Sequence, residues 1–389
     1  MNTLAIISEF NPFHNGHKYL LYKAKEELNA DLSISLMSGD FVQRGDASIL
    51  GKYKRAYCAV KLGFDLVIEM PNFISLQAAE FFARKSIEIL DKIKVDYLVF
   101  GIEKIDPKEF LSNCDIILSN KENILALQKV YMKQGLSFTR SKNLAISKYV
   151  DQDFLTSNNI LALEYVSSIR ELGSNMIPYP IKRMKSLNQD QDFLDEKFAS
   201  STAIRNNINK NIVNFMPDLS FNILDKYRDS FTVKDDEYLY DILKYKLFIE
   251  KKSMDQILSF EEGMDNYFRN IIKDNSSFED FLTQATSQRY TKSRIRRLIL
   301  NYILANEVYF NNLDIDFIKI LAYNKKSTKY FSEITKNMQI VINRSDSYKL
   351  KSNSLLIYKN MIDASNLYSL LTDTKINYDY LHNNRPIDW

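Results

Sequence analysis

Glycine, proline and cysteine are all scarce in this chain of 389 residues, which holds nine, seven and two of them. So little glycine and proline argues against a collagen-like or low-complexity chain, and the 45% of hydrophobic residues suffices for buried cores. The two cysteines, Cys58 and Cys114, have neither the spacing of a metal site nor a secretory context. We therefore expect both to be buried, reduced thiols.

Long hydrophobic runs and a strong net charge are also missing. No apolar stretch approaches the roughly 20 residues that span a bilayer, and the first residues show no basic segment or cleavage site of a secretory signal. We therefore expect a soluble, cytoplasmic protein with no membrane partner. The net charge of +3 gives no global argument for nucleic-acid binding, so any such argument depends on local clusters.

The N-terminal part of the chain alternates between two periodicities. Short, mostly apolar runs typical of strands buried on both faces occupy residues 4–10, 32–39, 65–71 and 96–101. Segments with helical spacing separate these runs. The alternation predicts a doubly wound, parallel α/β sheet. A fifth strand candidate, residues 175–183, contains two prolines and should be short or lie at an edge.

The pattern changes after residue 218. Glycine nearly vanishes, and long Lys/Asn/Leu/Ile/Tyr segments with a period of about 3.6 residues dominate. We predict that residues 1–218 form the α/β domain and that residues 219–389 form a separate, mainly α-helical domain. Pro217 and Asp218 interrupt the pattern at the expected boundary.

Two of the three histidines, His14 and His17, bracket Gly16 in the stretch NPFHNGHKYL, directly after the first strand. Ligands of an open α/β sheet bind beyond the carboxyl ends of the strands, where helix N-termini present free N–H groups. We expect a helix to begin near Asn15, with both imidazoles on one side of its first turn. Such a turn suits an anionic ligand, above all a polyphosphate under nucleophilic attack.

Two other interpretations of the histidine pair remain open on the residues alone. A histidine near a helix start is more often a capping or solvated residue than a catalyst. A His-x-x-His pair can also bind metal, and Glu9 could serve as a further ligand, whereas His382 lies in the C-terminal tail.

The stretch HNGH resembles the HxGH signature of the nucleotidyltransferase superfamily, whose members attack the α-phosphate of ATP and release pyrophosphate. The stretch FASSTAIR (198–205) resembles a second superfamily element, whose hydroxyl groups and Arg205 would cradle the triphosphate. Further stretches resemble one bacterial family, the tRNA(Met) cytidine acetate ligases. Among them are IISEFNPFHNGH, LMSGDFVQRGDASI, KYKRAYCAVKLGFDLVIEMP and SQRYTKSRIRRLIL. This resemblance covers essentially the whole chain.

The resemblance implies a Rossmann-like nucleotidyltransferase fold and a ligase that works in two steps. Acetate attacks the α-phosphate of ATP to give acetyl-adenylate, and the acetyl group then passes to N4 of the wobble cytidine of elongator tRNA(Met). Mg²⁺ is expected with the triphosphate and needs no dedicated protein site. Two alternatives remain: a nucleotidyltransferase that adenylylates a small phosphorylated metabolite, and a non-catalytic RNA-binding protein on a nucleotide-binding fold.

The resemblance also implies site residues. His14 and His17 would stabilise the charge at the phosphorus, and Arg44 in the loop 38–48 would face phosphate or the acetate carboxylate, unless that loop is only a solvated connection. Asn158 is expected to contact the nucleotide, and its neighbour Asn159 remains an alternative for this contact. The expected ATP-binding residues are Ile6, Ile7, Ser8, Glu9, Phe10, Asn11, Pro12, Phe13, His14, Asn15, Gly16, His17, Lys18, Tyr19, Gly101, Asn158, Lys182, Arg183, Ser201 and Thr202.

A basic helix is expected in the C-terminal part, because residues 283–306 include no acidic residue. An apolar stripe that includes Ile295 and Ile299 should dock this helix on its domain and leave its basic side outward. Outward cations would bind the phosphate backbone of tRNA, although a charge run is usually only a solvated face. The expected RNA-binding residues are Arg289, Lys292, Arg294, Arg296 and Arg297.

Overall fold

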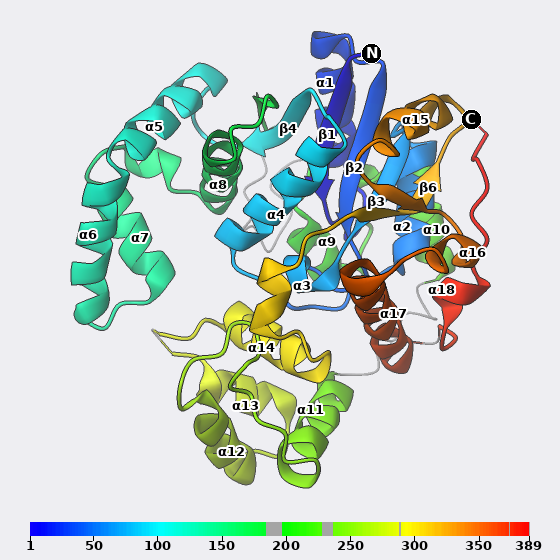
Figure 1. Cartoon of the computed structure of the whole chain (residues 1–389). Helices are drawn as coiled ribbons and strands as arrows, with labels where there is room; N and C mark the ends of the chain where they lie inside the picture. The colour runs from blue at the N-terminus through cyan, green and yellow to red at the C-terminus, as the bar shows by residue number, and fades with distance from the viewer. Residues whose placement is uncertain (184–196, 228–235, 288, 373, 389) are drawn as a thin grey trace.

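A seven-stranded sheet with helices on both faces forms the centre of the molecule in the computed structural model (Figure 1). The structure describes residues 1–183, 197–227, 236–287, 289–372 and 374–388. The strands are β1 (Thr3–Ser8), β2 (Leu32–Ser38), β3 (Leu66–Met70), β4 (Tyr97–Ile102), β5 (Ile177–Lys182), β6 (Phe317–Tyr323) and β7 (Gln339–Val341). Their order in the sheet is β5-β4-β1-β2-β3-β6-β7.

The α-helices connect and cover these strands. In the first half of the chain they are α1 (Asn15–Leu28), α2 (Lys52–Lys61), α3 (Asn72–Ser75), α4 (Ala79–Lys92), α5 (Pro107–Ser119), α6 (Lys121–Lys133), α7 (Phe138–Ile146) and α8 (Ser157–Glu171). In the second half they are α9 (Ser201–Asn206), α10 (Asp218–Lys226), α11 (Asp236–Lys244), α12 (Met264–Asp274), α13 (Phe278–Ala285), α14 (Lys292–Ile303), α15 (Phe331–Ile334), α16 (Arg344–Ser347), α17 (Ser352–Leu371) and α18 (Tyr378–Leu381). None of the described helices is long and apolar enough to cross a membrane.

The predicted doubly wound sheet is confirmed. Strands β1 to β5 pair in parallel, and β5, with its two prolines, lies at the edge beside β4. Alternate residues of β1 to β4 enter different cores: Ile34 and Ile68 face one side of the sheet, and Ile6 and Val67 the other. Strands buried on both faces explain the continuous apolar runs in the sequence.

The chain after residue 218 differs from the expected separate helical domain. Strand β6 pairs antiparallel with β3, and β7 pairs in parallel with β6, so this part of the chain completes the sheet that begins at β1. The charged Lys319 in the middle of β6 interrupts an otherwise apolar run, which hides the strand from a periodicity argument. The predicted division into residues 1–218 and 219–389 is therefore wrong for the segment from β6 onward.

A helical body does exist within the expected region, and we call residues 236–304 the helical module. Helices α11 to α14 gather below the sheet around a core of their own (Figure 1). Tyr240, Phe268 and Phe281 are fully buried there, and Leu298 of α14 joins them. The amphipathic spacing of these helices produces this core, as the sequence predicts.

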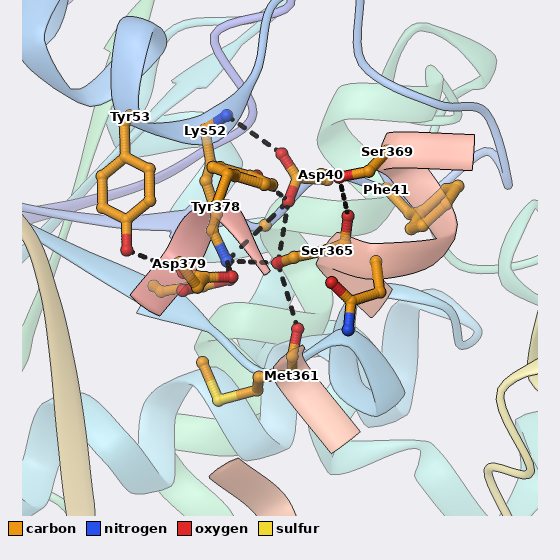
Figure 2. Close-up of polar contacts among 12 residues, drawn as sticks. Asp40, Phe41, Lys52, Tyr53, Met361, Ser365, Ser369, Tyr378 and Asp379 are labelled. Atoms are coloured by element: carbon orange, nitrogen blue, oxygen red, sulfur yellow. Dashed lines mark hydrogen bonds and ion pairs between the residues drawn. The ribbon is translucent and has the colours of Figure 1, made fainter. Parts of the chain in front are cut away.

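Buried charges connect the C-terminal segment to the sheet (Figure 2). The Lys52 ammonium contacts Glu69 Oε1 at 2.7 Å and Asp379 Oδ2 at 2.9 Å, and Lys319 pairs with the same two carboxylates. Asp40, in the loop after β2, accepts a hydrogen bond from the backbone N–H of Lys52 at 3.0 Å. These five side chains, which we call the charge cluster, are at most 5% exposed. Burial alone would raise the pKa of Asp379, but the two ammonium groups hold it below its ordinary value.

Replacing Lys319 by methionine tests the charge cluster. We expect Lys319→Met to lower the free energy of unfolding by roughly 3–5 kcal/mol, because the carboxylates of Glu69 and Asp379 would stay buried with one cation fewer. Urea unfolding measures this change. The control is Lys325→Met, which removes an exposed lysine paired with Asp388 and should leave the unfolding midpoint unchanged. Equal midpoints for both variants would contradict a stabilising role for the cluster.

Candidate active site

The HNGH stretch forms the turn between β1 and α1, as predicted. Helix α1 begins at Asn15, and His14 is its N-cap, with Nδ1 accepting a hydrogen bond from the N–H of Gly16 at 3.1 Å. His17 Nδ1 accepts in turn from the backbone N–H of His14 at 3.2 Å. The two imidazole rings are stacked, with their centroids 3.7 Å apart. Both histidines therefore cap the helix and also lie side by side at the carboxyl end of β1.

These caps determine where the imidazole protons reside. Since Nδ1 of each ring accepts a hydrogen bond, the proton of each neutral ring lies on Nε2, which is then a donor. Burial, followed by the charge of Arg183, lowers the pKa of His17 to about 3. Burial is also the largest cause of a pKa of His14 well below its ordinary value. In the free protein both histidines are thus neutral donors rather than cations or general acids.

The protonation of the pair can be measured by NMR. We expect the imidazole ¹⁵N and ¹³C shifts of His14 and His17 to stay constant from about pH 8 to about pH 5.5, because a pKa lowered by burial keeps the neutral form down to lower pH. The shifts should also report the Nε2–H tautomer. His14→Asn and His17→Asn variants assign the signals. A titration of either ring near pH 6.5, the ordinary value, would contradict this interpretation.

Gly16 is required by the His14 ring. A Cβ at this position would lie 2.9 Å from Cε1 and 3.0 Å from Nδ1 of His14. A larger residue would therefore push the capping ring out of place. The close neighbour of this glycine is therefore the first histidine itself.

A cavity of about 830 Å³ lies at the carboxyl ends of the central strands. It brings together segments that are distant in the sequence, namely the β1–α1 turn, the loop after β2, β4, α8, β5 and α9. The predicted site residues that line it are Ile6, Ile7, Ser8, Glu9, Phe10, His14, Gly16, His17, Tyr19, Arg44, Gly101, Asn158, Lys182, Arg183, Ser201 and Thr202.

The remaining residues of the predicted segment 6–19 do not line this cavity but support the turn. Phe13 packs against the ring of His17, with centroids 5.5 Å apart, and Asn15 Nδ2 donates to the backbone carbonyl of Asn214 at 2.8 Å. Asn11 Oδ1 accepts from the N–H of Ile49 at 2.8 Å. Pro12 is buried and Lys18 is exposed. None of these five residues lines the cavity, so they shape the site from outside it.

The wall formed by β4 and β5 depends on Gly101. A Cβ at Gly101 would lie 2.9 Å from Cγ of Arg183, so the absence of a side chain leaves room for the arginine. Arg183 pairs with Glu103 at 3.2 Å. Asn158 lines the cavity, whereas Asn159 is buried and accepts from the backbone N–H of Glu103 at 2.8 Å. Of the two asparagines, the structure therefore places Asn158 at the cavity.

The FASSTAIR stretch forms the opposite wall at the start of α9. Ser200 is the N-cap and accepts from the N–H of Ala203 at 3.1 Å, so it supports the helix, while Ser201 and Thr202 line the cavity. Arg205 also lines it and donates to the carbonyl of Asn11 at 2.8 Å. Arg44 donates to Thr202 Oγ1 at 3.4 Å, which places the loop after β2 against this wall.

The basic helix α14 docks differently from the expectation. Its apolar residues, including Ile295 and Ile299, are buried as predicted, but the five cations do not share one outward face. Arg296 is only 9% exposed and pairs with Asp46 and Asp236, each at 2.7 Å. The prediction of an exposed, free Arg296 is wrong, because the sequence pattern does not show which side of the helix meets the loop after β2.

The other four cations of this stretch divide into two groups. Arg289 and Arg294 both pair with Glu261, at 2.9 and 2.6 Å, and Lys292 pairs with Glu279 at 3.0 Å. Arg297 lines the cavity together with Thr291 and Ser293 of the same helix. The sequence showed only that residue 297 carries a positive charge. Its position in the site depends on how α14 docks. Gln288, which belongs to the motif SQRYTKSRIRRLIL, lies outside the described residues.

The two cysteines and the third histidine lie outside this cavity and have structural roles. Cys58 and Cys114 are buried free thiols, as expected, and burial raises the pKa of each to about 12. His382 stacks on Tyr53 with ring centroids 3.6 Å apart and does not line the cavity. In the described part of the chain, no group of three or more His, Cys, Asp or Glu side chains is arranged to hold a metal ion.

Comparison with known proteins identifies the family. Residues 1–383 match the family model described as HIGH Nucleotidyl Transferase. The tRNA(Met) cytidine acetate ligase of Thermoanaerobacter sp. (strain X514) is 34% identical over 387 residues, which cover 95% of each chain. That of Thermosipho melanesiensis is 36% identical over 359 residues, covering 88% of this chain and 84% of the relative. The chain belongs to the tRNA(Met) cytidine acetate ligase family.

Solved structures of this ligase family have the same fold. The apo structure of Thermotoga maritima TmcAL matches 99% of each chain with a TM-score of 0.87 at 28% identity. A second structure, of the same protein bound with alpha-thio ATP, matches with a TM-score of 0.85 at 27% identity and covers 99% of this chain and 100% of that one. The predictions of the family, the fold class and an ATP-binding ligase are therefore confirmed.

Proposed function

We propose that this protein joins acetate to ATP as acetyl-adenylate and then transfers the acetyl group to N4 of the wobble cytidine of elongator tRNA(Met), which forms N4-acetylcytidine. The observation that carries the proposal is the HNGH turn, whose two Nε2–H donors line a cavity rich in cations. The cations of this cavity are Arg44, Lys182, Arg183, Arg205 and Arg297. Positive charge around one small cavity suits ATP and acetate, which are both anions.

The first step needs no general base. The carboxylate oxygen of acetate, already ionised at neutral pH, attacks the α-phosphorus, and the bond to the β-phosphate breaks with pyrophosphate taking the electron pair. The residues therefore position the reactants and stabilise charge. Neutral His14 and His17 fit this role, since they donate hydrogen bonds to developing negative charge without transferring a proton.

The second step transfers the acetyl group. The N4 amine of cytidine attacks the acetyl carbon, the bond from this carbon to the phosphate oxygen breaks, and AMP departs while N4 loses a proton. Glu9 is the one carboxylate among the described residues that line the cavity. Mg²⁺ fits a site of this kind when most of its ligands are triphosphate oxygens and water, with Glu9 available as the protein ligand.

The tRNA partner requires a surface beyond the cavity. Arg289 and Lys292 are exposed at the start of α14, next to Thr291 and Ser293 on the rim of the cavity. They are the exposed members of the predicted RNA-binding set, and their partners Glu261 and Glu279 would have to exchange for phosphate. An enzyme with these substrates acts in the cytoplasm, where tRNA and ATP occur.

Acetate-dependent exchange of pyrophosphate into ATP tests the first step with the protein alone. We expect exchange in the presence of Mg²⁺ and acetate, and a decrease on the order of 10²-fold or more in His14→Ala and His17→Ala, because each variant loses one donor to the reacting phosphate. His382→Ala is the matched control, since that histidine lies outside the cavity and should leave exchange unchanged.

The outcomes separate the proposal from its rivals. Exchange that needs no acetate, but appears with a phosphorylated metabolite, would indicate a nucleotidyltransferase of small molecules. The absence of exchange under all conditions would indicate a binding protein. Nucleoside mass spectrometry of elongator tRNA(Met) after incubation with ATP and acetate then tests the second step, where N4-acetylcytidine is the expected product.

A further inference from the structure

Among the described residues, Arg297 is the one cation of the cavity that comes from the helical module. It lies in α14 and lines the same cavity as His14 and His17. One of its terminal nitrogens donates to the backbone carbonyl of Gln43 at 3.1 Å, and its Nε is buried with no hydrogen-bond partner among the described residues. A guanidinium carries five N–H donors, so this side chain retains unused hydrogen-bonding capacity inside the cavity.

The strand order shows at which end of the cavity Arg297 lies. Strands β4 and β5, which carry Gly101 and Lys182, lie on one side of β1, and β2 and β3 lie on the other. Arg297 contacts Gln43 in the loop after β2 and is therefore on the second side. Ala78, before α4 and after β3, lines the cavity there as well. A nucleoside that occupies the β4 and β5 side leaves the β2 side for the second reactant.

The close approach of α14 to the loop after β2 holds Arg297 in this place. Gly45 has a φ of +80°, and a Cβ there would lie only 2.8 Å from the backbone nitrogen of Arg297. The neighbouring Arg296 fastens the contact through Asp46 of the loop and Asp236 of α11, each at 2.7 Å. The guanidinium of Arg297 is therefore presented by rigid elements rather than by a free side chain on the surface.

Arg297 is half-buried and has no carboxylate partner among the described residues, which is costly for a cation, and an anionic ligand would remove that cost. Burial, with the like charge of Arg294 adding to it, lowers the pKa of Arg297 to about 10, so the side chain remains protonated at neutral pH. A carboxylate is the planar anion that fits a guanidinium with two parallel hydrogen bonds. Among the reactants of the proposed function, only acetate has this group.

We propose that Arg297 binds the carboxylate of acetate and orients it toward the α-phosphorus of ATP. This inference rests on the proposed function, and it gives the helical module a part in the chemistry of the first step. Arg183 and Arg205 line the parts of the cavity formed by the end of β5 and by α9, which leaves the triphosphate with cations of its own. The bonds made and broken are those of the first step, and Arg297 only positions the nucleophile.

The test is a comparison of Arg297→Gln and Arg297→Lys in the exchange reaction. We expect Arg297→Gln to raise the KM for acetate about tenfold or more, because a charge-assisted hydrogen-bond pair is lost, while the KM for ATP changes by less than about twofold. Arg297→Lys should fall between wild type and Arg297→Gln, since it keeps the charge without the planar fork. Lys273→Gln is the control in the same helical module, because Lys273 is exposed on α12 and does not line the cavity.

Three results would overturn the inference. An acetate KM that stays at the wild-type value in Arg297→Gln would show that the side chain does not bind acetate. A rise in the KM for ATP that equals or exceeds the rise for acetate would place Arg297 on the phosphates. A lower thermal midpoint in Arg297→Gln, with the acetate KM restored at low temperature, would show that the residue acts only on stability.

Failure of the proposed function is distinguishable from failure of this inference. Line broadening of ¹³C-acetate in the presence of the protein and a non-hydrolysable ATP analogue reports acetate binding without any chemistry. Wild type and Lys273→Gln should broaden the signal, and Arg297→Gln should not. Broadening that is equal in all three proteins would refute the role of Arg297 even if no exchange reaction were found.

Discussion

The free-energy cost of burying charge is the constraint on which this structure depends. Two lysines and three carboxylates are removed from water in the charge cluster, and each has an opposite charge within reach. Arg296 meets the same requirement with Asp46 and Asp236. The histidines of the HNGH turn avoid the cost by remaining neutral. In the described part of the chain, the Nε of Arg297 is one of the buried polar atoms without a hydrogen-bond partner, and the proposed acetate would place an anion beside it.

The loop after β2, residues 39–51, is held by several of these charges at once. Arg55, at the start of α2, donates to the backbone carbonyl of Leu50 at 2.8 Å. Asp40, at the beginning of the loop, accepts a hydrogen bond from the backbone of Lys52, and Asp46, in its middle, pairs with Arg296 of α14. A loop fixed in this way presents Arg44 and Gln43 to the cavity without having to be ordered by the substrate, which lowers the entropic cost of binding.

Local sequence patterns predicted the part of the site that is built from neighbouring residues. The apolar runs of β1 to β4 and the start of α1 near Asn15 depend on contacts within a few residues, and the structure agrees with both. The position of Arg297 and the pairing of β6 with β3 depend on contacts between distant segments, which periodicity does not encode. The same limit applies to Arg296, whose charge was visible in the sequence but whose partners were not.

The charge cluster has a consequence for the order in which the chain matures. Asp379 is synthesised 327 residues after Lys52, so the lysine has no complete set of partners until α18 leaves the ribosome. Up to that point Lys52 has Glu69 and Asp40 as partners but lacks Asp379. The charge cluster, which holds the start of the loop that carries Arg44, is therefore complete only when the C-terminal segment has folded against the sheet.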